Sequence, residues 1–279
     1  RVLVAGPPVT TTGGHLWYMG GEADGPEGIR ERVRSLIKDG ADLIKVVASG
    51  GSTITSDPYR PSLTVEEIRV AVSEAHNRGR PVAAHCRSTV SINNALDAQV
   101  DLVFHCGFYD QDGSYRFDED TAKRLAGSGV WINPTLHIGQ SRRAMFHHKR
   151  DHEGLNLEEE ALLTRLEDGA RLRADQFGRL VDMGARFVGG SDCGWGSYPF
   201  GDYQGELLDL ANVGLSPAKA ILAGTQYAAK ALGIDGSVGT IEPKKDANLL
   251  LVDGDPTEDL GALRKVIAVF LEGNRVDIT

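Results

Sequence analysis

Short hydrophobic runs alternate with amphipathic stretches along most of this 279-residue chain. The runs are rich in aliphatic residues and hold few polar positions, which is typical of strands in a parallel sheet that is covered on both faces. Between the runs, apolar residues recur at helical spacing, so the sequence predicts repeated units of one strand and one helix. The six runs are residues 1–5, 42–48, 81–86, 101–106, 130–136 and 186–192.

Helical patterns fill the spaces between these runs. Residues 29–37 place apolar side chains at helical spacing, and Thr64 with Glu67 forms a capping-box pattern at the start of a second helix. Residues 155–183 form one long amphipathic pattern, and a serine–proline pair opens a further helical pattern over 216–233. Strands and helices therefore alternate, which is the order expected of an α/β protein.

This order predicts a TIM-type (β/α)8 barrel, in which a helix follows each strand. A closed barrel has eight strands and six are recognised, so we expect the first two strands to be absent from this chain. The incomplete barrel is expected to occupy residues 1–237. Beyond it, two β-rich runs separated by turn residues predict a small β appendage over 238–279.

Composition narrows the class of function. The formal net charge is −9 and the isoelectric point is near 5.4, which argues against binding to nucleic acid or to anionic membranes and favours small-molecule chemistry. No apolar stretch approaches the ~20 residues of a membrane helix. The three cysteines are widely spaced, so no disulfide framework is expected and the cytoplasm is the expected compartment.

Three hydrophobic runs end on residue types that bind divalent metals. His85 lies in PVAAHC, His105 in VFHC and Asp192 in GGSDCG. Because the carboxyl ends of barrel strands meet at one mouth, we expect these side chains to converge. Imidazole and carboxylate are ligands of zinc and of similar hydrolytic ions. The pattern predicts a metal site in which Asp192 also serves as general base toward a water molecule.

Lys45 lies in the aliphatic run DLIKVVASGG and is expected to be buried. A buried ammonium group is costly unless it is paired or chemically altered. Reaction with carbon dioxide would turn this lysine into a carbamate, an anionic ligand that bridges metal ions. A salt bridge to Asp192 or to another carboxylate is the alternative, and the residue alone does not separate the two.

The segment TTTGGHLWYMGG follows the first run and places His15, Trp17 and Tyr18 on the expected rim of the barrel. His15 is a candidate electrophile toward the carbonyl of a substrate, and a loop-capping histidine is the alternative. Aromatic and basic residues after other strand ends are candidates for shaping the pocket or for the edge of the core. These residues are Arg87, Phe108, Tyr109, Trp195 and Tyr198.

The remaining histidines and cysteines are given structural interpretations. Strand parity turns Cys86 and Cys106 away from the barrel centre, which favours packing against the helices. His137 follows the fifth run and is expected either to touch the pocket or to form a structural hydrogen bond. A polar, basic stretch containing His147, His148 and His152 is expected to be a solvated loop.

With these motifs in view, the chain resembles the metal-dependent amidohydrolase superfamily, in the branch of imidazolonepropionase-like proteins and Xaa-Pro dipeptidases or carboxypeptidases. The similarity extends over nearly the whole chain. The motifs that carry it are TTTGGH, ADLIKVVASGG, PVAAHC, VFHCG, GGSDCG and GTIEPKKDANLLLVDGDP.

The resemblance implies a role for each of these strand-end residues. Lys45 would be the carboxylated bridging ligand, His85 and His105 would bind a second metal, and Asp192 would bind the first metal and act as base. One or two ions of Zn2+ or another divalent metal are implied. The resemblance implies that His15 contacts the substrate carbonyl. Trp17, Arg87 and Tyr109 are predicted to bind substrate from their places on the rim and after strand ends. The tail would form part of a small β-sandwich.

One family feature is expected and not found, namely a first strand that ends in a His-X-His pair. The chain is therefore interpreted as a piece that lacks the N-terminal region or as a truncated homologue. An open barrel exposes sheet edges, so we expect a homo-oligomer or pairing with the missing piece rather than a stable, fully active monomer.

The leading functional hypothesis is hydrolysis of an amide or peptide bond in a small substrate, such as an Xaa-Pro-like dipeptide or an N-acyl amino acid. Two alternatives are hydrolysis of a cyclic amide or imidazolone, or deamination, since the same centre attacks several carbon electrophiles. A third is a truncated, non-catalytic metal-binding scaffold. No motif supports a nucleotide-binding loop, because ASGGST lacks the required spacing.

Overall fold

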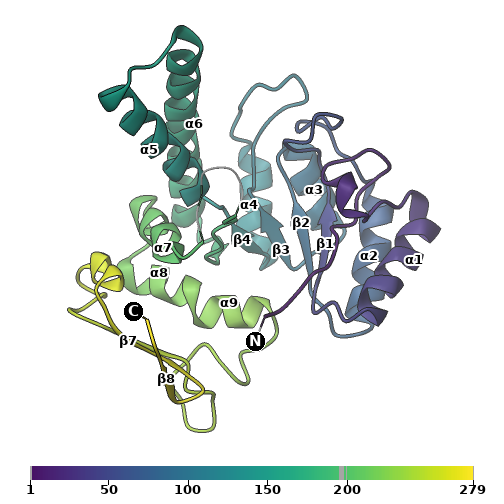
Figure 1. Ribbon diagram of the computed structural model, residues 1–279. Helices are drawn as coiled ribbons and strands as arrows, with labels where there is room; N and C mark the ends of the chain where they lie inside the picture. Colours follow the sequence, from purple (N-terminus) through teal and green to yellow (C-terminus); the bar gives the residue numbers. More distant parts are fainter. Residues whose placement is uncertain (1, 195–197, 199, 279) are drawn as a thin grey trace. The chain divides into compact units, whose positions relative to one another are not determined.

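The computed structural model describes residues 2–194, 198 and 200–278 (Figure 1). The chain divides into two compact units. Unit 1 comprises Arg1–Asn133 with Met183–Arg186, and unit 2 comprises Pro134–Asp182 with Phe187–Thr279.

A parallel sheet forms the centre of unit 1 (Figure 1). Its strands are β1 (Ile44–Val47), β2 (Val82–His85), β3 (Leu102–Phe104) and β4 (Trp131–Asn133), and the short β5 (Arg186–Phe187) comes last in the order. His85 lies opposite Val47 of β1 and opposite Phe104 of β3. The carboxyl ends of β1, β2 and β3 therefore lie side by side.

Helices α1 (Gly25–Lys38), α2 (Val65–His76), α3 (Thr89–Asp97) and α4 (Glu119–Ser128) pack in sequence order, each against the next. The capping box that the sequence predicts is present, with Thr64 accepting from the amide of Glu67 and the Glu67 carboxylate accepting from the amide of Thr64. The helices bury aliphatic faces, as Ile29 and Val33 of α1 are fully buried. This burial holds the strand ends in fixed register.

The position predicted for the first strand is wrong. Residues 2–5, the described part of the run 1–5, form no strand, and Val2 is 82% exposed. The chain instead pairs with β1 further on, where the Val9 amide donates to Lys45 O (2.8 Å) and the Val47 amide donates to Val9 O (2.9 Å). Val9 is fully buried, so burial rather than β-propensity selects the paired residue.

Unit 2 combines helices with a small antiparallel sheet. Strands β6 (Leu249–Val252), β7 (Val266–Leu271) and β8 (Asn274–Val276) form the sheet in that order. A 3-10 helix, η2 (Leu260–Arg264), lies between the first two of these strands. The α-helices are α5 (His137–His152), α6 (Leu157–Asp182), α7 (Tyr203–Asn212), α8 (Pro217–Gly224) and α9 (Gln226–Ala231).

Two predictions for this unit, one of a loop and one of a helix, require correction. The stretch with His147, His148 and His152 is the C-terminal part of α5 rather than a solvated loop, because Phe146 is buried and anchors the helix. The helix expected over 216–233 is two helices, because Thr225 departs from helical geometry with φ −130° and ψ −94°. The long helix expected over 155–183 is confirmed as α6.

The α/β class is confirmed, with a parallel five-stranded sheet of the kind found in part of a TIM-type barrel and antiparallel strands near the C-terminal end. Neither the boundary between a barrel at 1–237 and an appendage at 238–279 nor the β-sandwich is tested by this architecture, and both stay predictions. In the described part of the chain, no helix combines the length and the apolarity needed to cross a bilayer.

Candidate functional site

Two of the predicted ligands lie at neighbouring strand ends in unit 1. His85 is the last residue of β2, and His105 follows β3 directly. The backbone of His105 has φ +63° and that of Cys106 has φ +49°, a left-handed conformation that most side chains avoid. Strain of this kind at a strand end reorients a side chain and is common at functional sites.

Three imidazole rings form a row at this edge of the sheet. The ring centroids of His15 and His85 are 4.8 Å apart, and those of His85 and His105 are 4.5 Å apart. Although 90 residues separate His15 from His105 in the sequence, the fold brings both beside His85. The structure thus brings together His85 and His105, two of the four predicted ligands, and places His15 beside them.

The loop over residues 49–62, which follows β1, holds two of these rings. It folds back on the strand end, where the Ser62 amide donates to Ala48 O (2.9 Å). Nε2 of His85 lies 3.1 Å from Gly50 O. A carbonyl oxygen only accepts, so Nε2 of His85 carries the proton and Nδ1 keeps its lone pair. Histidines that bind metals commonly donate their second ring N–H to a backbone carbonyl in this way.

His15 is held by a second residue of the same loop. Its Nδ1 lies 2.8 Å from Thr53 Oγ1, and the Thr53 amide donates to the same nitrogen at 3.4 Å. Gly51 packs so closely on the ring that an added Cβ would lie 2.5 Å from Nε2. Glycine is therefore required at this position.

Both buried imidazoles are neutral at physiological pH. Desolvation, followed by the charges of Arg87 and Lys45, lowers the pKa of His15 to about 4. Desolvation, followed by the charge of Lys45, also lowers the pKa of His85 well below its ordinary value. Neutral imidazole is the form that binds a cation or donates one N–H without carrying charge.

Lys45 is half-buried rather than fully buried, which corrects the expectation from its aliphatic surroundings. Its Nζ lies 3.3 Å from the centroid of the Phe104 ring. This cation–π contact supplies a partner that the sequence pattern did not suggest. The position also places the lysine charge near the two neutral histidines, whose pKa values it lowers.

Asp192 belongs to unit 2, whereas the other three predicted ligands belong to unit 1. It is exposed and has φ +53°, a left-handed backbone like that of His105. Across the described residues, no three His, Cys, Asp or Glu side chains form a group that could hold a metal ion. A metal at the histidine row would therefore need a ligand of another type, and Lys45 is the candidate. The neighbouring Trp195 lies outside the described residues.

The other residues expected to bind substrate occupy different surroundings. Arg87 follows β2 and its charge acts on both buried histidines. Tyr109 packs between Tyr59 and Tyr115, with ring centroids at 5.4 and 5.8 Å. Trp17 lies in the 3-10 helix η1 (Trp17–Met19) and is 41% exposed.

Cys86 and Cys106 are buried, in agreement with packing rather than ligation. The Cys86 thiol contacts Ser91 O of α3 at 3.5 Å. Burial raises the pKa of this thiol to about 12, so it stays protonated. Phe108 stacks on Phe117 at 4.9 Å and belongs to the core edge.

The sequence interpretation missed the loop 49–62 as part of the site. Gly50, Gly51 and Thr53 all contact the histidine row, and Tyr59 contacts Tyr109. ASGGST was considered only as a nucleotide loop. The glycine pair directly after the strand of Lys45 was the available signal, because paired glycines permit close approach of a backbone to a neighbouring ring.

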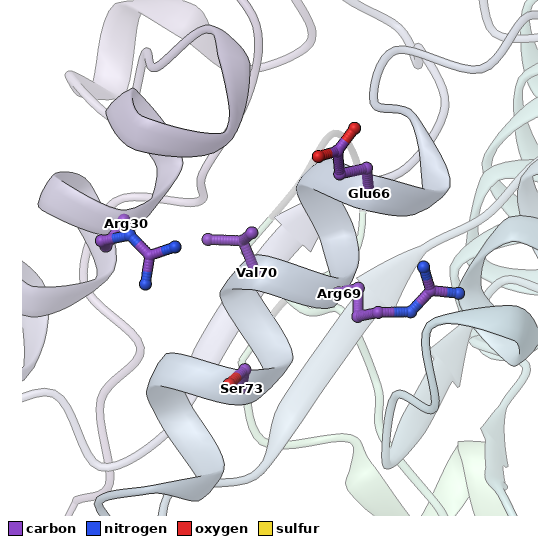
Figure 2. A pocket seen from close by; sticks show the side chains of 5 residues that line it. All are labelled: Arg30, Glu66, Arg69, Val70 and Ser73. Carbon is purple, nitrogen blue, oxygen red and sulfur yellow. The ribbon is translucent and has the colours of Figure 1, made fainter.

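A shallow hollow between α1 and α2 lies apart from the histidine row (Figure 2). None of its lining residues comes from a strand end. Arg30 pairs with Glu74 (2.6 Å) and Glu27 (3.2 Å), so its charge is already compensated. The hollow is lined by Arg30, Glu66, Arg69, Val70 and Ser73.

His137 lies in a separate charged cluster within unit 2. Nδ1 of His137 lies 2.7 Å from Asp209 Oδ2, and Nε2 lies 2.9 Å from Asp202 Oδ2. The His137 amide donates to Glu206 Oε2 at 2.8 Å. Of the two expected roles, structural hydrogen bonding is the one these contacts support. Tyr198 packs on the ring with its centroid at 5.0 Å.

Comparison with curated proteins finds similarity to an ochratoxinase. The chain is 28% identical over 250 residues to the ochratoxinase of Aspergillus niger, an alignment that covers 88% of this chain. It spans about half the length of the curated relatives it matches, at 48%.

Solved structures agree in fold. A Xaa-Pro dipeptidase crystallised with methionine in its active site has a TM-score of 0.81 and 27% identity, covering 99% of this chain and 68% of that one. The crystal structure of the A. niger ochratoxinase has a TM-score of 0.79 at 24% identity, covering 99% and 66%, and shows the fold alone. A profile described as the amidohydrolase family matches residues 1–276. The chain therefore belongs to the amidohydrolase family.

Proposed function

We propose that this chain carries the core of a metal-dependent hydrolase that cleaves an amide or peptide bond in a small substrate. The observation that supports this most directly is the row in which His15 lies beside His85 and His105, the latter two at adjacent strand ends, with Lys45 nearby. The Xaa-Pro dipeptidase among the similar structures suggests a dipeptide with C-terminal proline as the first substrate to test.

The donor set fits a divalent ion chemically. The Nε2–H of His85 is directed at Gly50 O, which leaves Nδ1 as the donor atom. His105 supplies a second imidazole 4.5 Å away, measured between ring centroids. We propose Lys45 as the third ligand, in its carbamate form, and Asp192 as a further ligand. A bound divalent ion would supply Lewis acidity, which polarises a carbonyl group and acidifies a water molecule.

The protein's own groups would then handle the substrate and the protons. His15 would donate its Nε2–H to the carbonyl oxygen of the scissile amide and stabilise the negative charge that develops there. Asp192 would take the proton from the attacking water and deliver it to the leaving nitrogen. Arg87, Tyr109 and Trp17 would bind the remainder of the substrate, with the guanidinium suited to a carboxylate.

Replacing a ligand and the base separately tests this proposal. In His85→Asn we expect loss of bound metal, measured by elemental analysis, and a fall in kcat/KM on Xaa-Pro dipeptides beyond the ~100-fold that loss of an orienting partner causes. In Asp192→Asn we expect turnover to be abolished with thermal unfolding unchanged, because the residue is exposed.

His76→Gln is the matched control, since His76 lies at the end of α2 and pairs with Asp101 at the surface (2.8 Å). It should keep both metal content and turnover. A wild-type protein that binds no divalent metal, or an Asp192→Asn variant with full turnover, would remove the proposal.

A further inference from the structure

Thr53 contacts His15 through both its side chain and its backbone. Its Oγ1 lies 2.8 Å from Nδ1 of His15, and its amide donates to the same nitrogen at 3.4 Å. The amide of Leu16, the residue after the histidine, donates to Thr53 Oγ1 at 3.0 Å. One residue of the loop 49–62 thus contacts both the imidazole and the backbone beside it.

The direction of these hydrogen bonds determines which ring nitrogen carries the proton. A backbone N–H only donates, so the amide of Thr53 requires Nδ1 of His15 to accept. Since Oγ1 already accepts from Leu16, its own hydrogen is available to donate to Nδ1. A neutral imidazole that accepts at Nδ1 holds its proton at Nε2.

Gly51 packs on the face of the same ring, near Nε2. A Cβ there would lie 2.5 Å from Nε2, 2.5 Å from Cδ2 and 2.7 Å from Cε1. Any larger residue at this position would displace the ring and, with it, the Nε2–H group. Thr53 therefore holds the ring by hydrogen bonds to Nδ1, and Gly51 lets the loop pack closely on it.

We propose that Thr53 is a positioning residue that fixes His15 in the Nε2–H tautomer, so that this N–H is presented to the carbonyl oxygen of the substrate. This inference rests on the proposed hydrolytic function for its consequence in catalysis. The tautomer itself is a property of the protein without substrate. The wrong tautomer would direct a lone pair at the carbonyl oxygen and repel it.

Histidine 15N chemical shifts, read in long-range 1H–15N spectra near pH 7.5, report the tautomer directly. The signals are assigned by their loss in His15→Asn. In wild type we expect an Nε2–H imidazole. Thr53→Val is nearly isosteric, loses the hydroxyl contact of 2.8 Å and keeps only the longer amide contact of 3.4 Å. We expect a mixture of tautomers and a fall in kcat of about tenfold, the effect of one lost hydrogen bond.

Two variants separate this role from a general effect on the loop. Thr53→Ser keeps the hydroxyl and should restore both the tautomer and the rate. Thr55→Val removes a hydroxyl from the same loop, one that donates to Gly13 O (2.8 Å), and should leave the His15 signals unchanged. A wild-type Nδ1–H tautomer, or an unaltered tautomer in Thr53→Val, would overturn the proposal. Failure to hydrolyse any amide would count against the proposed function while leaving the spectra to decide on Thr53.

Discussion

His85 ends a parallel strand and His137 follows another, and their surroundings shift their pKa values in opposite directions. His85 is buried beside Lys45. Desolvation and the positive charge of Lys45 lower its pKa. His137 lies between Asp209 and Asp202, and the hydrogen bond to Asp209 raises its pKa despite partial burial. The first is a neutral ring suited to ligation, and the second is a ring whose protonated form is favoured by two carboxylates.

The difference shows that a histidine at a strand end is not a functional signal by itself. Both ring nitrogens of His137 are engaged by carboxylates, so neither is left to act on a substrate. One nitrogen of His85 is engaged by the carbonyl of Gly50, and the other keeps its lone pair. We therefore expect variants of the His137 cluster to change stability and variants of the His85 row to change activity.

Removing His137 should give the largest change in stability. His137→Ala removes the ring that contacts both carboxylates, at 2.7 Å from Asp209 Oδ2 and 2.9 Å from Asp202 Oδ2. We expect the free energy of unfolding to fall by about 3 kcal/mol, measured by urea denaturation. His147→Gln is the control, because its half-exposed ring pairs with Glu167 at 3.3 Å and should contribute little. An equal loss in both variants would mean that the His137 cluster contributes no more to stability than a surface ion pair.

Gly205 packs on the ring of His137 and Gly51 packs on the ring of His15. The same glycine-to-alanine substitution can therefore be compared in the two regions. A Cβ on Gly205 would lie 2.3 Å from Nε2 of His137, and a Cβ on Gly51 would lie 2.5 Å from Nε2 of His15. We expect Gly205→Ala to cost about 2 kcal/mol of stability through overpacking. Gly51→Ala should lower kcat/KM with a smaller effect on unfolding, because it lies in a loop. If both variants lost only stability, the assignment of the two regions to different roles would be wrong.

The pH dependence of stability should show the smallest effect when it is compared over a single pH unit. Desolvation raises the pKa of Glu206, which is fully buried, from 4.5 to about 7. Between these values the folded state holds a proton that the unfolded state releases, so stability declines as pH rises through this window. We expect a slope of about 1 kcal/mol per pH unit.

Glu206→Gln should flatten this decline between pH 5 and 6.5, because the amide does not titrate. Above that range a decline should remain, since the raised pKa of His137 makes its contribution fall as pH rises. Unfolding curves at a series of pH values measure both parts. A wild-type stability that rises from pH 5 to 7 would contradict the assignment for Glu206.

The periodicity of apolar residues and the signals for helix starts and ends were sufficient to predict strands β1 to β4 and helices α1, α2 and α6. These elements bury aliphatic side chains at regular spacing, so local pattern and tertiary packing agree. The prediction of a strand at 1–5 was wrong because the described residues of that run are not buried in the core. Val9 pairs with β1 instead. Helix α5 was missed because a helix whose buried contact is mainly Phe146 has a weak apolar stripe.

The sequence by itself determined that His85 and His105 would stand near one another, because parallel strands end at a common edge. It also determined that Lys45 would lie on the strand beside them. Only the tertiary structure decided how the loop 49–62 folds back, since no periodic pattern describes a loop. That folding brings Gly50 to His85 and Thr53 to His15, and hydrogen-bond direction then sets the tautomer of each ring. The sign of each pKa shift likewise depends on which charges the fold brings close, and spacing along the chain does not encode that distance.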